Sequence, residues 1–147
     1  MALKGKTLLA YVAGIIDGEG NIGLYKHHKP QTKHGYSFIV CVRVVNTQLW
    51  LIELLRLQFG GYLQKIKPVS SARKQLWRWE LRAYKAITFL ELVLPYLQLK
   101  RQQAELAIQY QRKQYWGKKS TDEEWAIMEA QHILMCELNQ RGVKVNC

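Results

Sequence analysis

The sequence lacks an apolar run as long as the roughly 18 residues that a membrane-spanning helix requires. Its apolar stretch at residues 8–16 is shorter and lacks a secretory cleavage pattern. The chain also holds only three cysteines, which are widely spaced and form no Cys-x-x-Cys pair. These absences argue against a membrane protein, a secreted disulfide framework and a zinc knuckle, and we expect an intracellular protein.

Acidic residues are almost absent from one long segment. Residues 20–79 contain ten lysines and arginines but only Glu53 as an acid, and the whole chain has a formal net charge of +11. A positive charge concentrated in this way favours a polyanionic partner. Nucleic acid is favoured over an anionic membrane because no basic amphipathic helix stands out. A soluble protein that is merely basic is the plainer alternative.

Hydrophobic periodicity predicts the order of the elements. With 48% hydrophobic residues, residues 1–147 are expected to form a single domain. Alternating patterns predict one hairpin from residues 21–29 and 36–45 and another from residues 61–68 and 75–82. Helical spacing predicts helices over residues 7–17, 47–59 and 84–97, and two more over residues 100–115 and 121–140. The result is an α+β chain of order αββαββα with extra C-terminal helices.

The two-residue period of the strands sorts their side chains onto two faces. We expect Phe38, Val40, Val42, Val44, Trp77, Trp79 and Leu81 to face the helices. A mostly polar set faces outward: Tyr25, His27, Lys29, Ser37, Cys41, Arg43, Gln64, Ile66, Lys74, Arg78, Glu80 and Arg82. Because a β-ribbon fits the major groove, we predict that this set contacts DNA, with Arg43 and Arg78 at base edges. The alternative is that this face is simply solvated. The register of the first and third strands stays open, because placing Gln64 and Ile66 outward turns Lys65 and Lys67 inward.

Residues 12–20, Val-Ala-Gly-Ile-Ile-Asp-Gly-Glu-Gly, are the most informative segment. A nearly all-apolar helix reaches an acid between two glycines, and we expect Gly18 and Gly20 to release the chain from the helix. A helix this apolar must be covered on more than one side, by the chain's own core and by a partner. Small residues four apart, such as Gly14 and Gly18, let two helices approach closely. An ordinary buried helix with a glycine stop is the alternative.

This segment resembles the signature of the LAGLIDADG homing endonucleases, and the αββαββα order resembles their fold. The match begins with Val12 and has Glu19 where aspartate is common, and the family accepts both acids. The resemblance implies an antiparallel, saddle-shaped sheet. It also implies a homodimer that cuts both strands of a long pseudo-palindromic DNA site and leaves 3′ overhangs. The biological role that it implies is intron homing within an organelle, an archaeon or a bacterium. The residues that it places at the dimer interface are Leu8, Tyr11, Val12, Gly14, Ile15 and Asp17.

The resemblance also implies an active site. Glu19 matches the metal-binding acid, and the Gly18 carbonyl matches the backbone oxygen that joins it. Oxygen ligands suit Mg²⁺ or another hard divalent cation. Asn46 matches a polar residue that orders water, and Lys100 matches a basic residue near the scissile phosphate, so Glu19, Asn46 and Lys100 are the candidate catalytic residues. Lys118 and Lys119 are expected phosphate contacts.

Two other functions use the same features. An intron RNA maturase on this fold would use the basic face without needing Glu19 for catalysis. A DNA-binding regulator would keep the motif only as a dimer contact, because Gly14 and Gly18 have a packing role without metal, and it would bind DNA without nicking it.

Overall fold

The computed structural model describes residues 4–112 and 120–140. Its elements are α1 (Gly5–Glu19), β1 (Gly20–His28), β2 (Tyr36–Asn46), α2 (Leu49–Phe59), β3 (Tyr62–Ile66), β4 (Leu76–Arg82), α3 (Ala83–Val93), η1 (Leu94–Tyr96), α4 (Arg101–Arg112) and α5 (Asp122–Leu138). The α+β class, the order αββαββα and the two added helices are confirmed. None of these helices is long and apolar enough to cross a membrane.

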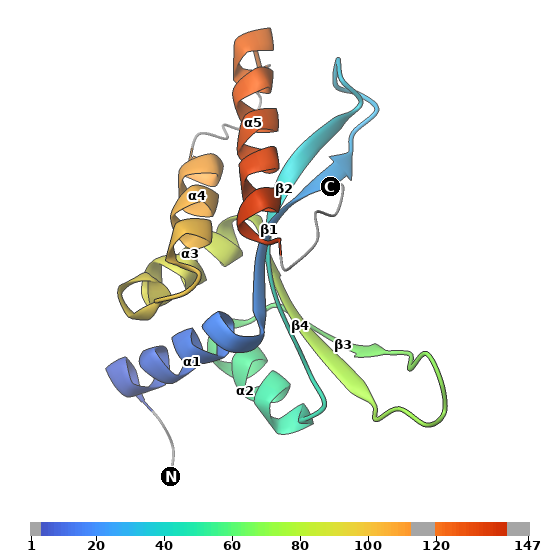
Figure 1. The fold of residues 1–147 in the computed structure, drawn as a ribbon, viewed down its shortest axis with the longest axis vertical. Helices are drawn as coiled ribbons and strands as arrows, with labels where there is room; N and C mark the ends of the chain where they lie inside the picture. The colour runs from blue at the N-terminus through green and yellow to red at the C-terminus, as the bar shows by residue number, and fades with distance from the viewer. Residues whose placement is uncertain (1–3, 113–119, 141–147) are drawn as a thin grey trace.

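The four strands form one antiparallel sheet of order β1-β2-β4-β3, so the second strands of the two hairpins lie side by side at its centre. The helices cover one side of this sheet, and the hairpins extend toward different ends of the molecule (Figure 1). Helix α5 runs beside the β1–β2 hairpin, whereas the β3–β4 hairpin projects beyond the helices. Among residues 4–112 and 120–140, no helix covers the other side of the sheet.

Several helix ends differ from the sequence prediction by a few residues, and two of them have a clear physical cause. Helix α1 continues through Gly18 to Glu19, and Gly20 alone ends it, with its N–H donating to the carbonyls of Ile15 and Ile16. A Cβ at Gly20 would lie 2.8 Å from Ile16 Cα, so this close approach requires glycine. Helix α3 stops at Val93 and tightens into η1, because Pro95 has no N–H with which to continue an α-helix.

The core fills the space between the helices and the inner face of the sheet. Trp79, at its centre, is fully buried, packs edge-on against Phe89 at 5.2 Å between ring centroids, and donates from Nε1 to the Gly60 carbonyl at 2.7 Å. The predicted inner residues Phe38, Val40, Val42, Val44, Trp79 and Leu81 are all buried. Trp77 is only half-buried, because it lies where the hairpin leaves the helices.

The strand pairing settles the question of register. Tyr25 and His27 on β1, and Gln64 and Ile66 on β3, pair with outward-facing residues of their neighbours, as predicted. Lys65 pairs with Trp77 on the helix side, yet it is exposed, because no helix covers that part of the hairpin. Its Nζ lies 5.8 Å from the centroid of the Trp77 ring.

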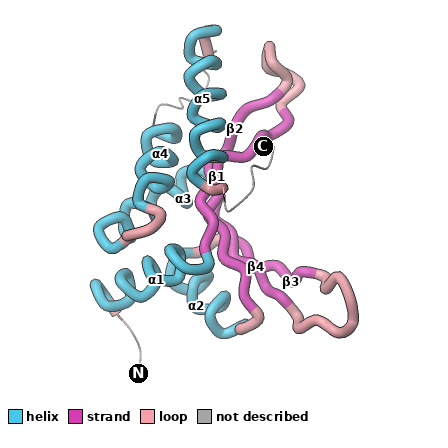
Figure 2. The backbone as a smooth tube through the Cα atoms, in the orientation of Figure 1, coloured by secondary structure: helices cyan, strands magenta, loops and turns pink. Residues whose placement is uncertain are grey.

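The hairpin strands are shorter at their tips than predicted. Loops occupy residues 29–35 and 67–75, at the far ends of the two hairpins (Figure 2). Lys29, Lys67 and Lys74 therefore lie in loops, and their expected strand faces do not apply. Gln75 also leaves its strand, where its Nε2 donates to the carbonyls of Ile66 and Leu76.

Candidate functional site

The C-terminal end of α1 is joined to the start of α4 by two side chains that bond in opposite directions. The Asp17 carboxylate accepts the backbone N–H groups of Gln98, Leu99 and Lys100 at 2.9 to 3.1 Å. In return, the Lys100 ammonium donates to the carbonyls of Ile16 and Asp17, both at 2.9 Å. Each helix end has unpaired backbone groups, and each side chain satisfies those of the other element.

This arrangement gives two predicted site residues a role within the chain itself. Asp17 holds the chain's own 98–100 segment, and its place at a dimer interface stays a prediction. Lys100 is 7% exposed, so its side chain is buried at the start of α4. Its proximity to a scissile phosphate stays a prediction, but its position is fixed beside the carbonyls that immediately precede Gly18.

Glu19, one turn beyond Ile16, is exposed at the end of α1. Its Oε2 accepts a hydrogen bond from Asn46 Nδ2 at the end of β2. The amide of Asn46 is oriented in turn, because its Oδ1 accepts the Gln48 N–H at 2.8 Å. The structure therefore brings Glu19, Asn46 and Lys100, three residues far apart in the sequence, to one end of one helix.

The donors at this helix end are few. Across residues 4–112 and 120–140, no group of three or more His, Cys, Asp or Glu side chains gathers around a common point. A metal ion would have the Glu19 carboxylate and the Gly18 carbonyl as protein donors. This set fits Mg²⁺, which is usually bound through one or two carboxylates and keeps waters and substrate phosphates in its shell.

The exposed side of α1 carries small residues beside Tyr11. Tyr11 is 39% exposed, and Gly14 and Gly18 are exposed next to it along the helix. A Cβ built on either glycine would meet no atom within 4 Å, so this chain's own packing does not require glycine there. Leu8 and Val12, also predicted at the dimer interface, are buried in the chain's own core and offer it no surface. Ile15 is half-buried.

The outer face of the sheet carries an ion-pair cluster at its centre. Arg43 on β2 and Glu80 on β4 are direct cross-strand partners, and Arg82 follows two residues along β4. Glu80 accepts Nε of Arg43 on one carboxylate oxygen and Nε of Arg82 on the other. Burial acts to raise the pKa of the Glu80 carboxyl, but the two guanidiniums together hold it below its ordinary value.

Burial corrects two of the predicted DNA contacts. Glu80 is 3% exposed and Cys41 is 1% exposed, so neither side chain reaches a ligand on this face. Burial also raises the pKa of the Cys41 thiol. The other outward residues predicted to contact DNA are half-buried or exposed on the outer face: Tyr25, His27, Ser37, Arg43, Gln64, Ile66, Arg78 and Arg82. Their contact with DNA stays a prediction. Lys118 and Lys119 lie outside the described residues.

Arg78 and Gln64 form a second outer pair. They are cross-strand partners, and the Arg78 Nη2 donates to Gln64 Oε1. The Nε of Arg78 is buried and has no hydrogen-bond partner within the described part of the chain. Arg78 thus has a guanidinium that is only partly satisfied by the protein.

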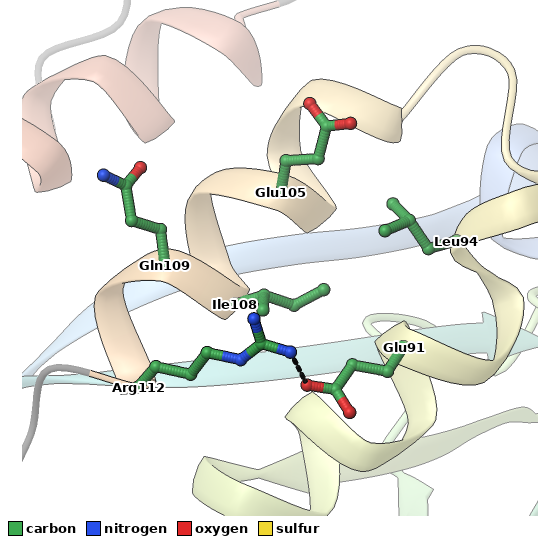
Figure 3. A pocket seen from close by; sticks show the side chains of 6 residues that line it. All are labelled: Glu91, Leu94, Glu105, Ile108, Gln109 and Arg112. Carbon is green, nitrogen blue, oxygen red and sulfur yellow. Dashed lines mark hydrogen bonds and ion pairs between the residues drawn. The ribbon is translucent and has the colours of Figure 1, made fainter.

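A separate hollow lies on the helical side, between α3 and α4 (Figure 3). It has a volume of about 580 Å³ and is lined by Glu91, Leu94, Glu105, Ile108, Gln109 and Arg112. Arg112 and Glu91 face each other across it in an ion pair of 2.6 Å. None of the predicted site residues lines it, so it is no part of the α1 site.

Sequence reasoning named Glu19, Asn46 and Lys100, which the structure brings to one helix end, but it missed what orients them. The cap from Asp17 to residues 98–100 has no local signature, because its two halves are more than 80 residues apart. The bridging role of Glu80 had one visible signal: it is the single acid in the outward alternation of the fourth strand.

Comparison with known proteins bears on the fold. No family model matches the sequence, and no curated protein matches it. The homing endonuclease I-CvuI, in complex with its target in the presence of Ca, aligns with a TM-score of 0.76 and 22% identity over 94% of this chain and 86% of that one. The archaeal intron-encoded homing endonuclease I-Vdi141I, complexed with DNA, aligns with a TM-score of 0.76 and 12% identity over 95% of this chain and 89% of that one.

A longer protein matches as well. The LAGLIDADG homing endonuclease I-LtrWI, bound to target DNA, aligns with a TM-score of 0.63 and 16% identity over 90% of this chain but only 45% of that one. The present chain thus corresponds to about half of I-LtrWI and to most of I-CvuI and I-Vdi141I. The resemblance drawn from residues 12–20 is confirmed at the level of structure: this chain has the fold of the LAGLIDADG homing endonucleases.

Proposed function

We propose that this protein is a site-specific endonuclease that cuts both strands of duplex DNA with the aid of a divalent metal ion. The observation that carries the proposal is the end of α1, where an exposed Glu19 is oriented by Asn46 and lies one turn beyond the carbonyls bound by Lys100. The open, arginine-bearing face of the sheet supports it, as does a fold shared with homing endonucleases that were solved with DNA.

Each residue at this helix end has a definable task. Asn46 holds the Glu19 carboxylate in one orientation, and Glu19 and the Gly18 carbonyl would hold the metal ion. A divalent ion bound there supplies positive charge to a phosphate and lowers the pKa of bound water. The buried Lys100 fixes the backbone that carries Gly18 and adds a positive charge near the same point, which favours the phosphate group of a substrate.

The proposed enzyme acts as a homodimer. Each chain supplies one candidate metal-binding acid, Glu19, whereas a double-strand cut requires two sites, and a C2 pair of chains provides both. The exposed Gly14 and Gly18, which the monomer does not need as glycines, would let the α1 helices of two copies approach. A C2 dimer has a pseudo-palindromic target, and we expect cleavage to leave 3′ overhangs.

A plasmid library of candidate intron-insertion sequences tests the function. Purified protein is incubated with the library in Mg²⁺ and in EDTA, beside Glu19→Gln and the matched control Glu53→Gln, which removes an exposed acid from α2. We expect linear product only in Mg²⁺, from the unmutated protein and from Glu53→Gln, whereas Glu19→Gln binds without cutting.

Three outcomes would overturn this assignment. Normal cleavage by Glu19→Gln would place the active site elsewhere. Binding without any cutting by the unmutated protein would favour the regulator, and tighter binding of intron RNA than of duplex DNA would favour the maturase.

A further inference from the structure

A buried acid stands at the centre of the face that is otherwise most basic. Asn21, Arg43, Glu80 and Tyr62 are in register across β1, β2, β4 and β3, so they form one row over all four strands. The Glu80 side chain is 5% exposed, whereas those of Arg43 and Arg82 are 27% and 53% exposed. The acid therefore lies beneath the two arginines, which cover it from solvent.

The carboxylate uses both of its oxygens. One accepts Nε of Arg43, and the other accepts Nε of Arg82. A guanidinium has five N–H donors in a rigid plane, so the use of Nε leaves the two terminal amino groups as the fork that a ligand can meet. Glu80 thus selects the same end-on presentation for both arginines.

Aromatic rings restrict the arginines further. The Arg43 guanidinium lies 4.2 Å from the centroid of the Tyr25 ring, and Tyr25 itself donates to Asn21 Oδ1. The Arg82 guanidinium lies 5.9 Å from the Tyr62 ring. Each arginine is therefore held by the shared carboxylate and by a ring of an edge strand, which lowers the rotamer freedom that binding would otherwise have to remove.

We propose that Glu80 is a positioning residue that fixes Arg43 and Arg82 as a pair of guanine-reading side chains. An end-on arginine fork matches the O6 and N7 acceptors that guanine presents in the major groove. The inference rests on the proposed DNA binding. It makes the base preference at the centre of the sheet depend on an acid that orients the two arginines and does not itself contact DNA.

Charge gives the acid a second effect. Two arginines with one carboxylate carry a local charge of +1 in place of +2, so the cluster attracts phosphates less than two free arginines would. Non-specific binding to DNA depends on neutralised phosphates, whereas base edges are read through hydrogen bonds. Glu80 therefore lowers affinity for any DNA while it raises the preference for one sequence.

Selection from a pool of random-sequence duplex DNA tests the inference. We expect the unmutated protein to enrich guanine at two positions of each half-site, and Glu80→Gln to lose the preference at those two positions, by about 5- to 140-fold each, while the other positions keep theirs. The slope of log K against log salt for random duplex should steepen by about 0.9 for one added phosphate contact.

Glu53→Gln is the matched control. It makes the same change in net charge on the helical side of the molecule, and it should alter neither the two guanine positions nor the specificity elsewhere. Thermal unfolding of each variant is measured in parallel. A uniform loss of preference at all positions by Glu80→Gln would contradict a positioning role.

Arg43→Gln and Arg82→Gln give a test that does not depend on the Glu80 variant folding. Each should lose one of the two guanine positions and keep the other. Retention of both by Glu80→Gln, or by both arginine variants, would overturn the inference while the proposed DNA binding stands. An unmutated protein that binds no duplex would overturn the proposed function itself.

Discussion

Replacing Lys100 by methionine tests the bond network at the end of α1. Methionine has a similar length and can occupy the buried space of the Lys100 side chain, but it cannot donate to the carbonyls of Ile16 and Asp17, each 2.9 Å from Nζ. Leaving a buried acceptor unpaired costs about 1–3 kcal/mol. The buried Ile16 carbonyl keeps the N–H of Gly20, whereas the partly buried Asp17 carbonyl loses the Lys100 donor, which gives about 1–3 kcal/mol for the variant.

This loss is measurable as a change in melting temperature. For a domain of this size, about 1 kcal/mol lowers Tm by roughly 2–4 °C, so Lys100→Met should lower Tm by about 2–12 °C. Circular dichroism melting and urea unfolding give the change, with Lys85→Met, at an exposed site on α3, as the matched control. An unchanged Tm for Lys100→Met would refute the idea that this ammonium ties the two helices together. Loss of cleavage in this variant has to be judged against its loss of stability.

Two further predictions concern other parts of the molecule. Tyr110 donates to the Phe38 carbonyl at 2.8 Å, and burial raises its pKa to about 12, above the ordinary 10.0. Its contribution to the unfolding free energy is therefore complete below pH 10 and is lost as the pH rises to 12, by up to about 2–3 kcal/mol. Urea unfolding at pH 7 and pH 11 should show a smaller loss in Tyr110→Phe than in the unmutated protein, and equal losses would contradict the assignment. Gly14→Leu should leave the monomer's Tm nearly unchanged and abolish dimerisation in light scattering, whereas Thr88→Leu, at an exposed site on α3, should dimerise normally. A dimer that survives Gly14→Leu would contradict pairing through α1.

The parts of the fold that depend on local patterns were predictable. The inner face of the sheet follows from alternation in β2 and β4, because a strand with one buried face must repeat its apolar residues every second position. The position of Glu19 at the end of a helix followed from the motif. Glycine alone was a poor guide to the helix end, since Gly18 keeps helical geometry and only Gly20, pressed against Ile16, ends it.

The parts that depend on distant partners were not predictable. Nothing near Asp17 indicates that its carboxylate accepts the N–H groups of residues 98–100, and nothing near Lys100 indicates that its ammonium is buried. Glu80 was assigned to an exposed contact because alternation gives the face of a residue but not its depth. Arg43 and Arg82 bury the Glu80 carboxylate, because arginine side chains are long enough to fold over it from two neighbouring positions.

The length of β2 has a geometric consequence for the proposed complex. Its 11 residues rise by about 3.4 Å each, so the strand spans roughly 34–37 Å, close to one turn of B-form DNA. Outward side chains recur about every 6.8 Å, the height of two stacked base pairs. The strand and the duplex therefore have commensurate repeats, and one outward residue faces every second base pair. Base pairs between those steps are within reach only of long side chains that lean sideways, and arginine is the longest that the central strands provide.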